Sequence, residues 1–203
     1  MLTEIIQSGY TSSNLLKHIN RSRLQQMLLR RFHRTAAEFF AQTGARSVLD
    51  AGCGEGFAIR ELLSHHAATV VGLDGSVGAL RVATMLNPQR SFAAGDLLEL
   101  PFPNNSFDLV VCMEVLEHLD NPREGLDELC RVSREWLLLT VPNEPFFRGA
   151  NFMRGKNMHA FGNDPGHVNH WSARAFLRFV TPAAQVVTWR TSFPWTLVLC
   201  RIA

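Results

Sequence analysis

Between residues 46 and 141, short apolar runs alternate with stretches of helical periodicity, and this alternation constrains the fold more than any other feature. Runs such as RSVLDA, ATVVGLD and SFDLVVCM resemble buried strands, whereas VGALRVATML and GLDELCRVS have the spacing of amphipathic helices. Strands that alternate with helices in this way form a parallel sheet with helices on both faces. The sequence therefore predicts an α/β fold with a doubly wound, Rossmann-like sheet.

The two ends of the chain depart from this alternation. Apolar residues recur at helical spacing from Ser13 to Phe40, which predicts one or two helices ahead of the sheet. Near the C-terminus, the helical stretch ARAFLRFVT precedes the strand-like runs QVVTWRT and TLVLCRI, which only SFPW separates. Because so short a connection joins antiparallel strands, one edge of the sheet is expected to be antiparallel.

The bulk properties of the chain fit one globular domain. Its 203 residues are 46% hydrophobic and 19% charged, and its four cysteines form no CxxC pair, which indicates reduced thiols. The N-terminus MLTEIIQSGY lacks the features of a signal peptide, and the longest apolar run, around WLLLTV, is too short to span a bilayer. We therefore expect a cytoplasmic protein without a transmembrane segment.

The stretch VLDAGCGEG, residues 48–56, places three glycines directly after the first predicted strand. A phosphate-binding P-loop requires a lysine after the glycines, and a dinucleotide-binding loop requires a third glycine where this chain has Phe57. Asp50 precedes the glycines and Glu55 lies among them. The negative charge would repel a pyrophosphate, so the loop favours a ligand that carries positive charge.

Carboxylates also end the next two predicted strands. Asp74 follows Gly54 by twenty residues, at the position where an acidic residue of such a sheet accepts hydrogen bonds from ribose hydroxyls. Asp96 ends the third strand, where it can meet an adenine amino group. These positions predict a nucleoside with a cationic extension, and S-adenosylmethionine is such a molecule.

Four segments resemble, in order, the motifs of class I S-adenosylmethionine-dependent methyltransferases of the methyltransferase type 11/12-like kind: VLDAGCGEG, VVGLDGS, GDLLELPFPNNSFDLVVCMEVLEHLDNP and LLLTVPN. The resemblance implies a seven-stranded, mostly parallel sheet with an antiparallel last strand, and methyl transfer from S-adenosylmethionine. We expect one methyltransferase domain with four parts: an N-terminal helical cap (1–44), a cofactor-binding core (45–141), an acceptor-side lid (142–171), and a C-terminal helix with a closing hairpin (172–203).

The same resemblance implies a set of cofactor-binding residues: Asp50, Gly52, Cys53, Gly54, Asp74, Gly75, Ser76, Asp96, Leu97, Met113 and Glu114. In this assignment Asp50 faces the ammonium group and Asp74 holds the ribose. Asp96 and Leu97 border the adenine, while Met113 lies under the sulfonium. Cys53 is expected to fill space in the loop rather than to react.

The segment EVLEHL bears on the methyl acceptor. Glu114, Glu117 and His118 have i, i+3 and i+4 spacing, which would place them on one helical face, and GHVNHW adds His167 downstream. These four residues are a candidate set of divalent-metal ligands. The pattern resembles two metal-dependent branches of the family, the ubiquinone-pathway O-methyltransferases and the enzymes that methylate the 3′-terminal 2′-hydroxyl of small RNAs. The alternative is that His118 and His167 line the acceptor pocket as catalytic residues without a metal.

Basic residues gather in the predicted N-terminal helices and in the aromatic-rich stretch PNEPFFRGANFMRGKNM. Both features suit an anionic or lipid-linked acceptor, or single-stranded RNA, but a charged helix is usually only a solvated face. The net charge of +2 and the lack of an appended binding module argue against a nucleic-acid partner. The basic residues of the helices are Lys17, Arg21, Arg23, Arg30, Arg31 and Arg34.

Three functions therefore stay open. The favoured one is an S-adenosylmethionine-dependent methyltransferase that acts on a small-molecule or lipid-linked acceptor, at oxygen. The second is a metal-dependent 2′-O-methyltransferase that acts on an RNA 3′ end. The third is a domain that binds the cofactor without turnover.

Overall fold

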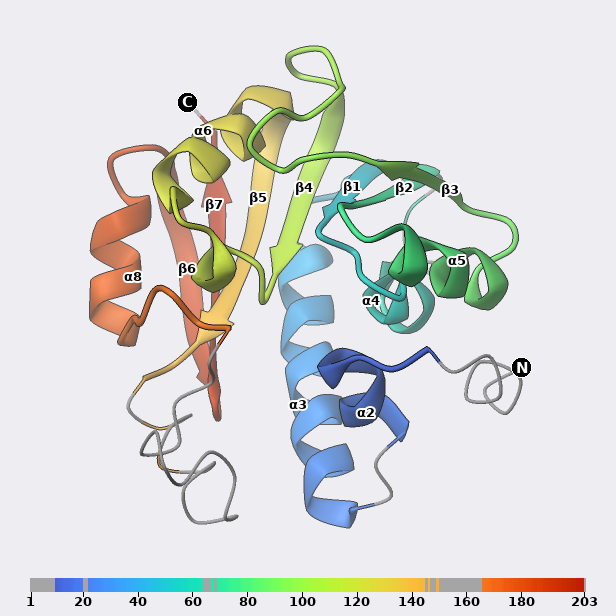
Figure 1. The fold of residues 1–203 in the computed structure, drawn as a ribbon. Helices are drawn as coiled ribbons and strands as arrows, with labels where there is room; N and C mark the ends of the chain where they lie inside the picture. Colours follow the sequence, from blue (N-terminus) through green and yellow to red (C-terminus); the bar gives the residue numbers. More distant parts are fainter. Residues whose placement is uncertain are drawn as a thin grey trace.

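The computed structural model describes residues 10–19, 22–63, 67, 69–144, 146, 149 and 166–202. Its centre is a seven-stranded sheet with the strand order β3-β2-β1-β4-β5-β7-β6 (Figure 1). The strands from β1 to β5 pair in parallel, whereas β7 is antiparallel to both β5 and β6. The α/β fold predicted from the sequence, a mostly parallel sheet with an antiparallel last strand, is confirmed. The strands are β1 (Ser47–Ala51), β2 (Thr69–Asp74), β3 (Ser91–Ala94), β4 (Phe107–Met113), β5 (Ser133–Pro142), β6 (Gln185–Ser192) and β7 (Trp195–Arg201).

Helices cover both faces of the sheet, and the predicted N-terminal helices come first in the chain (Figure 1). One face packs against α3 and α4, and the other against α6 and α8. No helix in the described ranges has the length and apolarity needed to cross a membrane. The helices are α2 (Ser13–Ile19), α3 (Arg23–Phe40), α4 (Phe57–Glu61), α5 (Val77–Leu86), the 3-10 turn η2 (Leu116–His118), α6 (Pro122–Val132) and α8 (Ala173–Val180).

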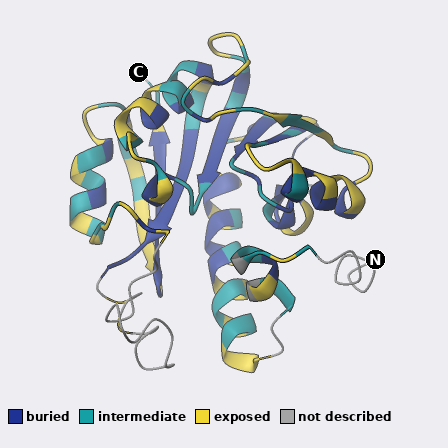
Figure 2. Ribbon diagram, viewed as in Figure 1, coloured by how far each residue is buried: buried dark blue, intermediate teal, exposed yellow. Residues whose placement is uncertain are grey.

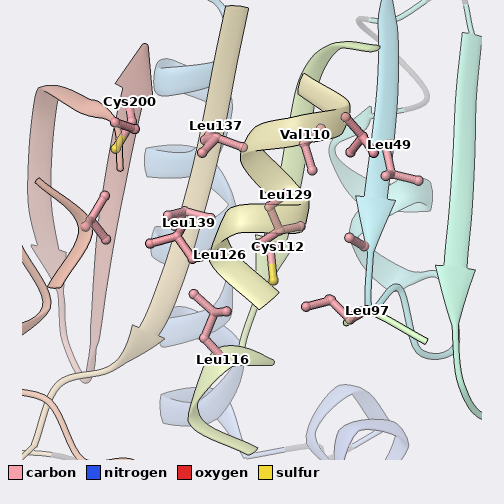
Figure 3. Close-up of a cluster of buried hydrophobic side chains, with 14 of the residues drawn as sticks. Leu49, Leu97, Val110, Cys112, Leu116, Leu126, Leu129, Leu137, Leu139 and Cys200 are labelled. Carbon is pink, nitrogen blue, oxygen red and sulfur yellow. The ribbon is translucent and has the colours of Figure 1, made fainter. Parts of the chain in front are cut away.

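The central strands are buried on both faces, as expected for a parallel sheet between two helical layers (Figure 2). Successive side chains of a strand point to opposite faces, so β4 sends Val110 and Cys112 to one side, and Leu109 and Val111 to the other. Figure 3 shows the first of these layers, in which leucines of α6 lie against β4 and β5. The two cores hold the carboxyl ends of the strands in fixed register.

The strand order places a topological switch between β1 and β4. From β1 the chain proceeds to β2 and β3 on one side, and then crosses to β4 and β5 on the other. The connections that leave β1 and β4 therefore diverge, which opens a crevice at the carboxyl ends of these strands. In Figure 1, α2 and a large part of α3 lie beyond the arrowhead of β4, next to this crevice.

Candidate cofactor and acceptor site

Two cavities meet at the carboxyl ends of β1, β2 and β4. The first cavity has a volume of about 320 Å³ and lies between the glycine loop (52–56), α2, α3 and the end of β4. The second cavity lies beside the ends of β2 and β3. Gly52, Asp74 and Val115 line both, so the two cavities form a continuous crevice.

Gly52 occupies a position that only glycine can fill. Its φ of +78° lies in the left-handed region, and a Cβ atom there would stand 2.4 Å from Cγ2 of Val115. The loop is fixed to β2 because the backbone N–H groups of Gly52 and Cys53 donate to the Leu73 carbonyl at 2.7 and 2.9 Å. At Gly52 and Gly54, which have no side chain, the backbone borders the crevice directly.

Asp50 lies at the end of β1, is 2% exposed and lines the first cavity. Its Oδ2 atom has no hydrogen-bond partner among the described residues. Burial, with a further contribution from the charge of Asp74, raises the pKa of Asp50 to about 7. A cationic group in the cavity would supply the missing partner and favour the ionised carboxylate.

Asp74 lies at the end of β2, where both cavities meet. Its Oδ2 accepts the N–H of Gly54 and its Oδ1 accepts the N–H of Ser76, each at 2.8 Å. A carboxylate has further lone pairs, so Asp74 can hold the loop and still accept hydrogen bonds from ligand hydroxyls.

The second cavity contains Gly75, Asp96 and Leu97, the residues predicted to lie near the adenosine. Leu97 is buried, whereas Asp96 is exposed and accepts the N–H of Leu98. Ser76 lines neither cavity, because its Oγ accepts the N–H of Ala79 and caps α5. Ser76 is thus a helix cap in this structure, and its backbone N–H holds Asp74, so it lies beside the predicted ribose site.

Cys53, Met113 and Glu114 line the first cavity, as do the four proposed acceptor-side residues. Burial raises the pKa of the Cys53 thiol well above its usual range, so the thiol stays protonated, in keeping with a space-filling role. The predicted helical face of Glu114, Glu117 and His118 is wrong. Glu114 has a φ of +60° and precedes a single 3-10 turn, so the spacing of an α-helix does not apply.

The side chain of Glu114 is instead directed to β7, where its Oε2 accepts the indole N–H of Trp195 at 2.6 Å. Glu117 is 1% exposed. Its carboxylate oxygen and the ring nitrogens of His118 and His167 that could ligate a metal all lie within 4.8 Å of one another. The structure therefore brings together three of the four candidate metal ligands, without Glu114.

The histidine pair His118 and His167 is held in place by the segment 166–171. The imidazole rings are 4.9 Å apart between centroids, at 69°. Nδ1 of His118 donates to the Gly166 carbonyl at 2.6 Å, since that oxygen can only accept. The backbone N–H of Asn169 donates to the Glu117 carbonyl at 3.0 Å, which ties the segment to η2.

Glu55 holds the N-terminal segment on the glycine loop. Its carboxylate is 2% exposed and accepts the Tyr10 hydroxyl at 2.9 Å, the Asn14 amide at 2.6 Å and the Ser12 hydroxyl. From the sequence, Glu55 was expected to add negative charge toward the ligand. In the structure it connects the loop to α2 instead.

The first cavity also contains two histidines that were not predicted from the sequence, His18 of α2 and His33 of α3. Their only signal in the sequence is their residue type, because their partners Phe57 and Glu61 are distant in the sequence. The arginines of α3 (Arg23, Arg30, Arg31 and Arg34) are exposed, as expected for a solvated face. Most of the predicted lid, and the basic stretch within it, lies outside the described residues.

Comparisons with known proteins agree with this geometry. Residues 49–136 match the family model described as a methyltransferase domain. The chain is 38% identical over 99 residues to a probable tocopherol O-methyltransferase, chloroplastic, of Oryza sativa subsp. japonica, which covers 46% of this chain and 27% of that protein. It is 34% identical over 105 residues to the demethylmenaquinone methyltransferase of Renibacterium salmoninarum. This match covers 52% of this chain and 44% of that protein.

Among solved structures, the chain is similar to magnesium protoporphyrin IX methyltransferase from Synechocystis PCC 6803 with bound SAH. The TM-score is 0.69 at 15% identity, covering 99% of this chain and 94% of the other. The chain spans less than half of the length of both curated relatives.

Proposed function

This chain carries a class I S-adenosylmethionine-dependent methyltransferase domain, and from that premise we propose that it transfers a methyl group from S-adenosylmethionine to an oxygen atom of a small, uncharged acceptor. The observation that carries the proposal is the buried carboxylate of Asp50, which lines the cavity of the glycine loop and whose Oδ2 atom has no hydrogen-bond partner among the described residues. An ammonium group of the cofactor would provide that partner.

In this proposal the cofactor occupies both cavities. The methionine part lies against Gly52, Cys53 and Gly54, with its ammonium group on Asp50. The ribose hydroxyls donate to Asp74, and the adenine lies in the second cavity beside Leu97. The sulfonium then points into the first cavity near Met113, where the acceptor has to bind.

The composition of the first cavity favours a largely apolar acceptor without negative charge. Carboxylates line it, and no lysine or arginine does among the residues whose side chains the structure describes. Such a lining repels phosphates, which disfavours an RNA acceptor. The apolar lining residues next to these carboxylates are Leu29, Phe32, Phe57, Met113, Val115 and Trp195.

We propose His118 as the base for the acceptor hydroxyl. Because Nδ1 donates to Gly166, the neutral imidazole has its lone pair on Nε2, which can take the proton. The hydroxyl oxygen attacks the methyl carbon in line, the sulfur–carbon bond breaks, and the neutral thioether leaves. His167 is proposed to support the imidazole of His118 from its buried position.

A second candidate is metal-assisted O-methylation at the same place. The convergence of Glu117, His118 and His167 within 4.8 Å fits a divalent ion, which would lower the pKa of a bound hydroxyl. Dialysis against a chelator, followed by assays with and without Mg²⁺, separates the two candidates. Activity that survives chelation supports the base, and activity restored only by the metal supports the ion.

Calorimetry with S-adenosylmethionine, NAD and ATP tests the cofactor assignment. We expect the methionine derivative alone to bind, and tighter binding of either phosphorylated nucleotide would overturn the proposal. Labelled cofactor incubated with neutral phenols and other small hydroxyl compounds, beside carboxylic acids and short RNAs, tests the acceptor class. Binding without transfer to any small molecule in a cell extract would favour the non-catalytic alternative.

A further inference from the structure

Glu144 is a buried carboxylate that the proposed reaction does not use. It lies just after the end of β5, is 7% exposed, and neither of its oxygens has a hydrogen-bond partner among the described residues. In the part of the chain that the structure describes, its ion-pair contacts are with two histidines and with no lysine or arginine. A carboxylate buried in this way costs stability unless another group compensates its charge.

The two histidines beside Glu144 are placed at a distance that suits an ion between them. Nδ1 of His167 and Nδ1 of His170 each lie 3.8 Å from the same oxygen, Oε1 of Glu144. This separation is too long for a hydrogen bond. In a tetrahedral zinc site with bonds of about 2.0–2.2 Å, the ligand atoms are about 3.3–3.6 Å apart. Both nitrogen–oxygen distances are therefore within a few tenths of an ångström of the spacing that zinc requires.

The backbone and one side-chain amide bring these three residues together. The N–H of Glu144 donates to the Trp171 carbonyl at 2.9 Å, which joins the end of β5 to the segment 166–171. Between the two histidines, the side-chain amide of Asn169 donates to the Leu119 carbonyl at 2.6 Å. Figure 1 shows this segment, in orange, beside the arrowhead of β5. The donor groups are thus held close to one another by contacts other than their own.

We propose that Glu144, His167 and His170 bind a zinc ion, which joins the segment 166–171 to the end of β5. One donor atom from each of the three lies within 4.8 Å of the other two. Two imidazoles and a carboxylate suit zinc, whereas Mg²⁺ prefers oxygen ligands. The side chain of His170 is 34% exposed, so water can reach the site and occupy a fourth position. The ion compensates the buried charge of Glu144.

The zinc site is distinct from the candidate site of Glu117, His118 and His167, with which it shares only His167. Neither Glu144 nor His170 was predicted as a ligand from the sequence, and neither lines the first cavity. A neutral imidazole has a single lone pair, so His167 can serve only one of the two ions at a time. A zinc ion on Glu144 and His170 would therefore disfavour a metal at the acceptor and leave His118 as the base.

Zinc binding can be measured without cofactor or acceptor, so the proposal does not depend on the proposed function. The protein is purified without a histidine tag, treated with a chelator, and titrated with Zn²⁺ by calorimetry. Titration with Co²⁺ adds a visible absorption that reports a four-coordinate geometry. We expect one ion per chain, with a dissociation constant in the micromolar range or below. At free Zn²⁺ 100-fold above that constant, the midpoint of thermal unfolding should rise by about 5–10 °C.

Single substitutions identify the ligands. Glu144→Gln and His170→Gln should each weaken Zn²⁺ binding about 100-fold or more and abolish the thermal shift, because loss even of an outer partner of a metal ligand costs up to about 100-fold. Val168→Ala is the control and should change neither, since Val168 is on the same segment, is 56% exposed and offers no ligand atom. His118→Gln should leave zinc binding unchanged. Circular dichroism verifies that each variant is folded.

Three results would overturn the proposal. The first is tight zinc binding that persists in Glu144→Gln and His170→Gln. The second is binding only at millimolar Zn²⁺, or none, which would leave Glu144 with two imidazoles and an adventitious ion at most. The third is loss of the ion in His118→Gln, which would assign it to Glu117, His118 and His167 instead. None of these results bears on binding of S-adenosylmethionine, which tests the proposed function separately.

Discussion

The first cavity has two walls, and each presents a pair of imidazoles next to carboxylates. The cofactor wall has His18 and His33 with the half-exposed Glu61, and the acceptor wall has His118 and His167 with the buried Glu117. On both walls a backbone carbonyl accepts from a ring Nδ1: that of Asn14 from His18, and that of Gly166 from His118. The walls differ in the burial of their carboxylates: the side chain of Glu61 is 44% exposed and is screened by water, whereas Glu117 is 1% exposed.

The largest expected effect is on the acceptor wall. His118→Gln should lower kcat by about 10²- to 10⁴-fold, the range for removal of a general base, and leave the affinity for S-adenosylmethionine within about twofold. Single-turnover transfer from labelled cofactor, measured beside calorimetry, separates the two quantities. Val168→Ala, on the segment 166–171 that holds His118 but lining neither cavity, is the control. A parallel loss of cofactor affinity in His118→Gln would show that His118 also contributes to cofactor binding, so that the two walls do not have separate functions.

The second prediction concerns the point where the two cavities meet, between Gly52 and Val115. Gly52→Ala places a Cβ atom 2.4 Å from Val115 at a φ of +78°, so we expect a loss of about 2–4 kcal/mol in the free energy of unfolding and no measurable cofactor binding. Gly44→Ala is the matched control, because Gly44 has a φ of +61° but open space around its Cβ position. It should cost only about 1 kcal/mol. Denaturant unfolding measures both, and equal losses would mean that the Val115 contact is unimportant.

The fold could be predicted from the sequence because strands and helices repeat their apolar residues at different periods. The same periods did not specify burial at the N-terminus, where Leu24 and Met27 follow the apolar spacing of α3 but are 57% and 58% exposed. Burial there depends on what the helix packs against. Helix α3 packs on the sheet through its C-terminal half, so its first turns extend beyond the carboxyl ends of the strands.

The residues of the site likewise divide into those that could be predicted from the sequence and those that could not. Asp50, Gly52 and Asp74 were identifiable because their positions follow from strand ends in a parallel sheet. His18, His33 and Trp195 were not, since helix docking and the closing hairpin bring them to the loop from distant parts of the chain. Glu114 was misplaced because the sequence does not reveal the positive φ that turns the chain before η2.

The third prediction concerns how pH changes the contributions of Asp50 to folding stability and to cofactor affinity. The ordinary aspartate pKa is 3.8, and that of Asp50 is raised to about 7, so its contribution to folding stability is full below pH 4 and is lost as pH rises through 7. Cofactor binding has the opposite trend because the ammonium requires the ionised form. Affinity for S-adenosylmethionine should rise several-fold from pH 6 to pH 8 in the unmodified protein. Asp50→Asn should remove this dependence and weaken binding at pH 8 by about tenfold. Calorimetry at both pH values is the measurement, and an unchanged pH profile in the variant would contradict the assignment.

The smallest expected effect is a change in the pKa of Tyr10, which reports on the docking of the N-terminal segment on the glycine loop. It can be observed because Tyr10 is the single tyrosine of the chain. Burial, and next the hydrogen bond to Glu55, raise the pKa of Tyr10 to about 12. Glu55→Gln removes the negative charge that opposes ionisation of the phenol and loosens the docking of α2. The pKa of Tyr10 should therefore fall toward its ordinary value of 10. Ultraviolet titration between pH 9 and 11 follows Tyr10 alone, because tryptophan does not ionise in this range. A Tyr10 that titrates normally in the unmodified protein would mean that the segment does not dock on the loop, and the cofactor wall would then lack His18.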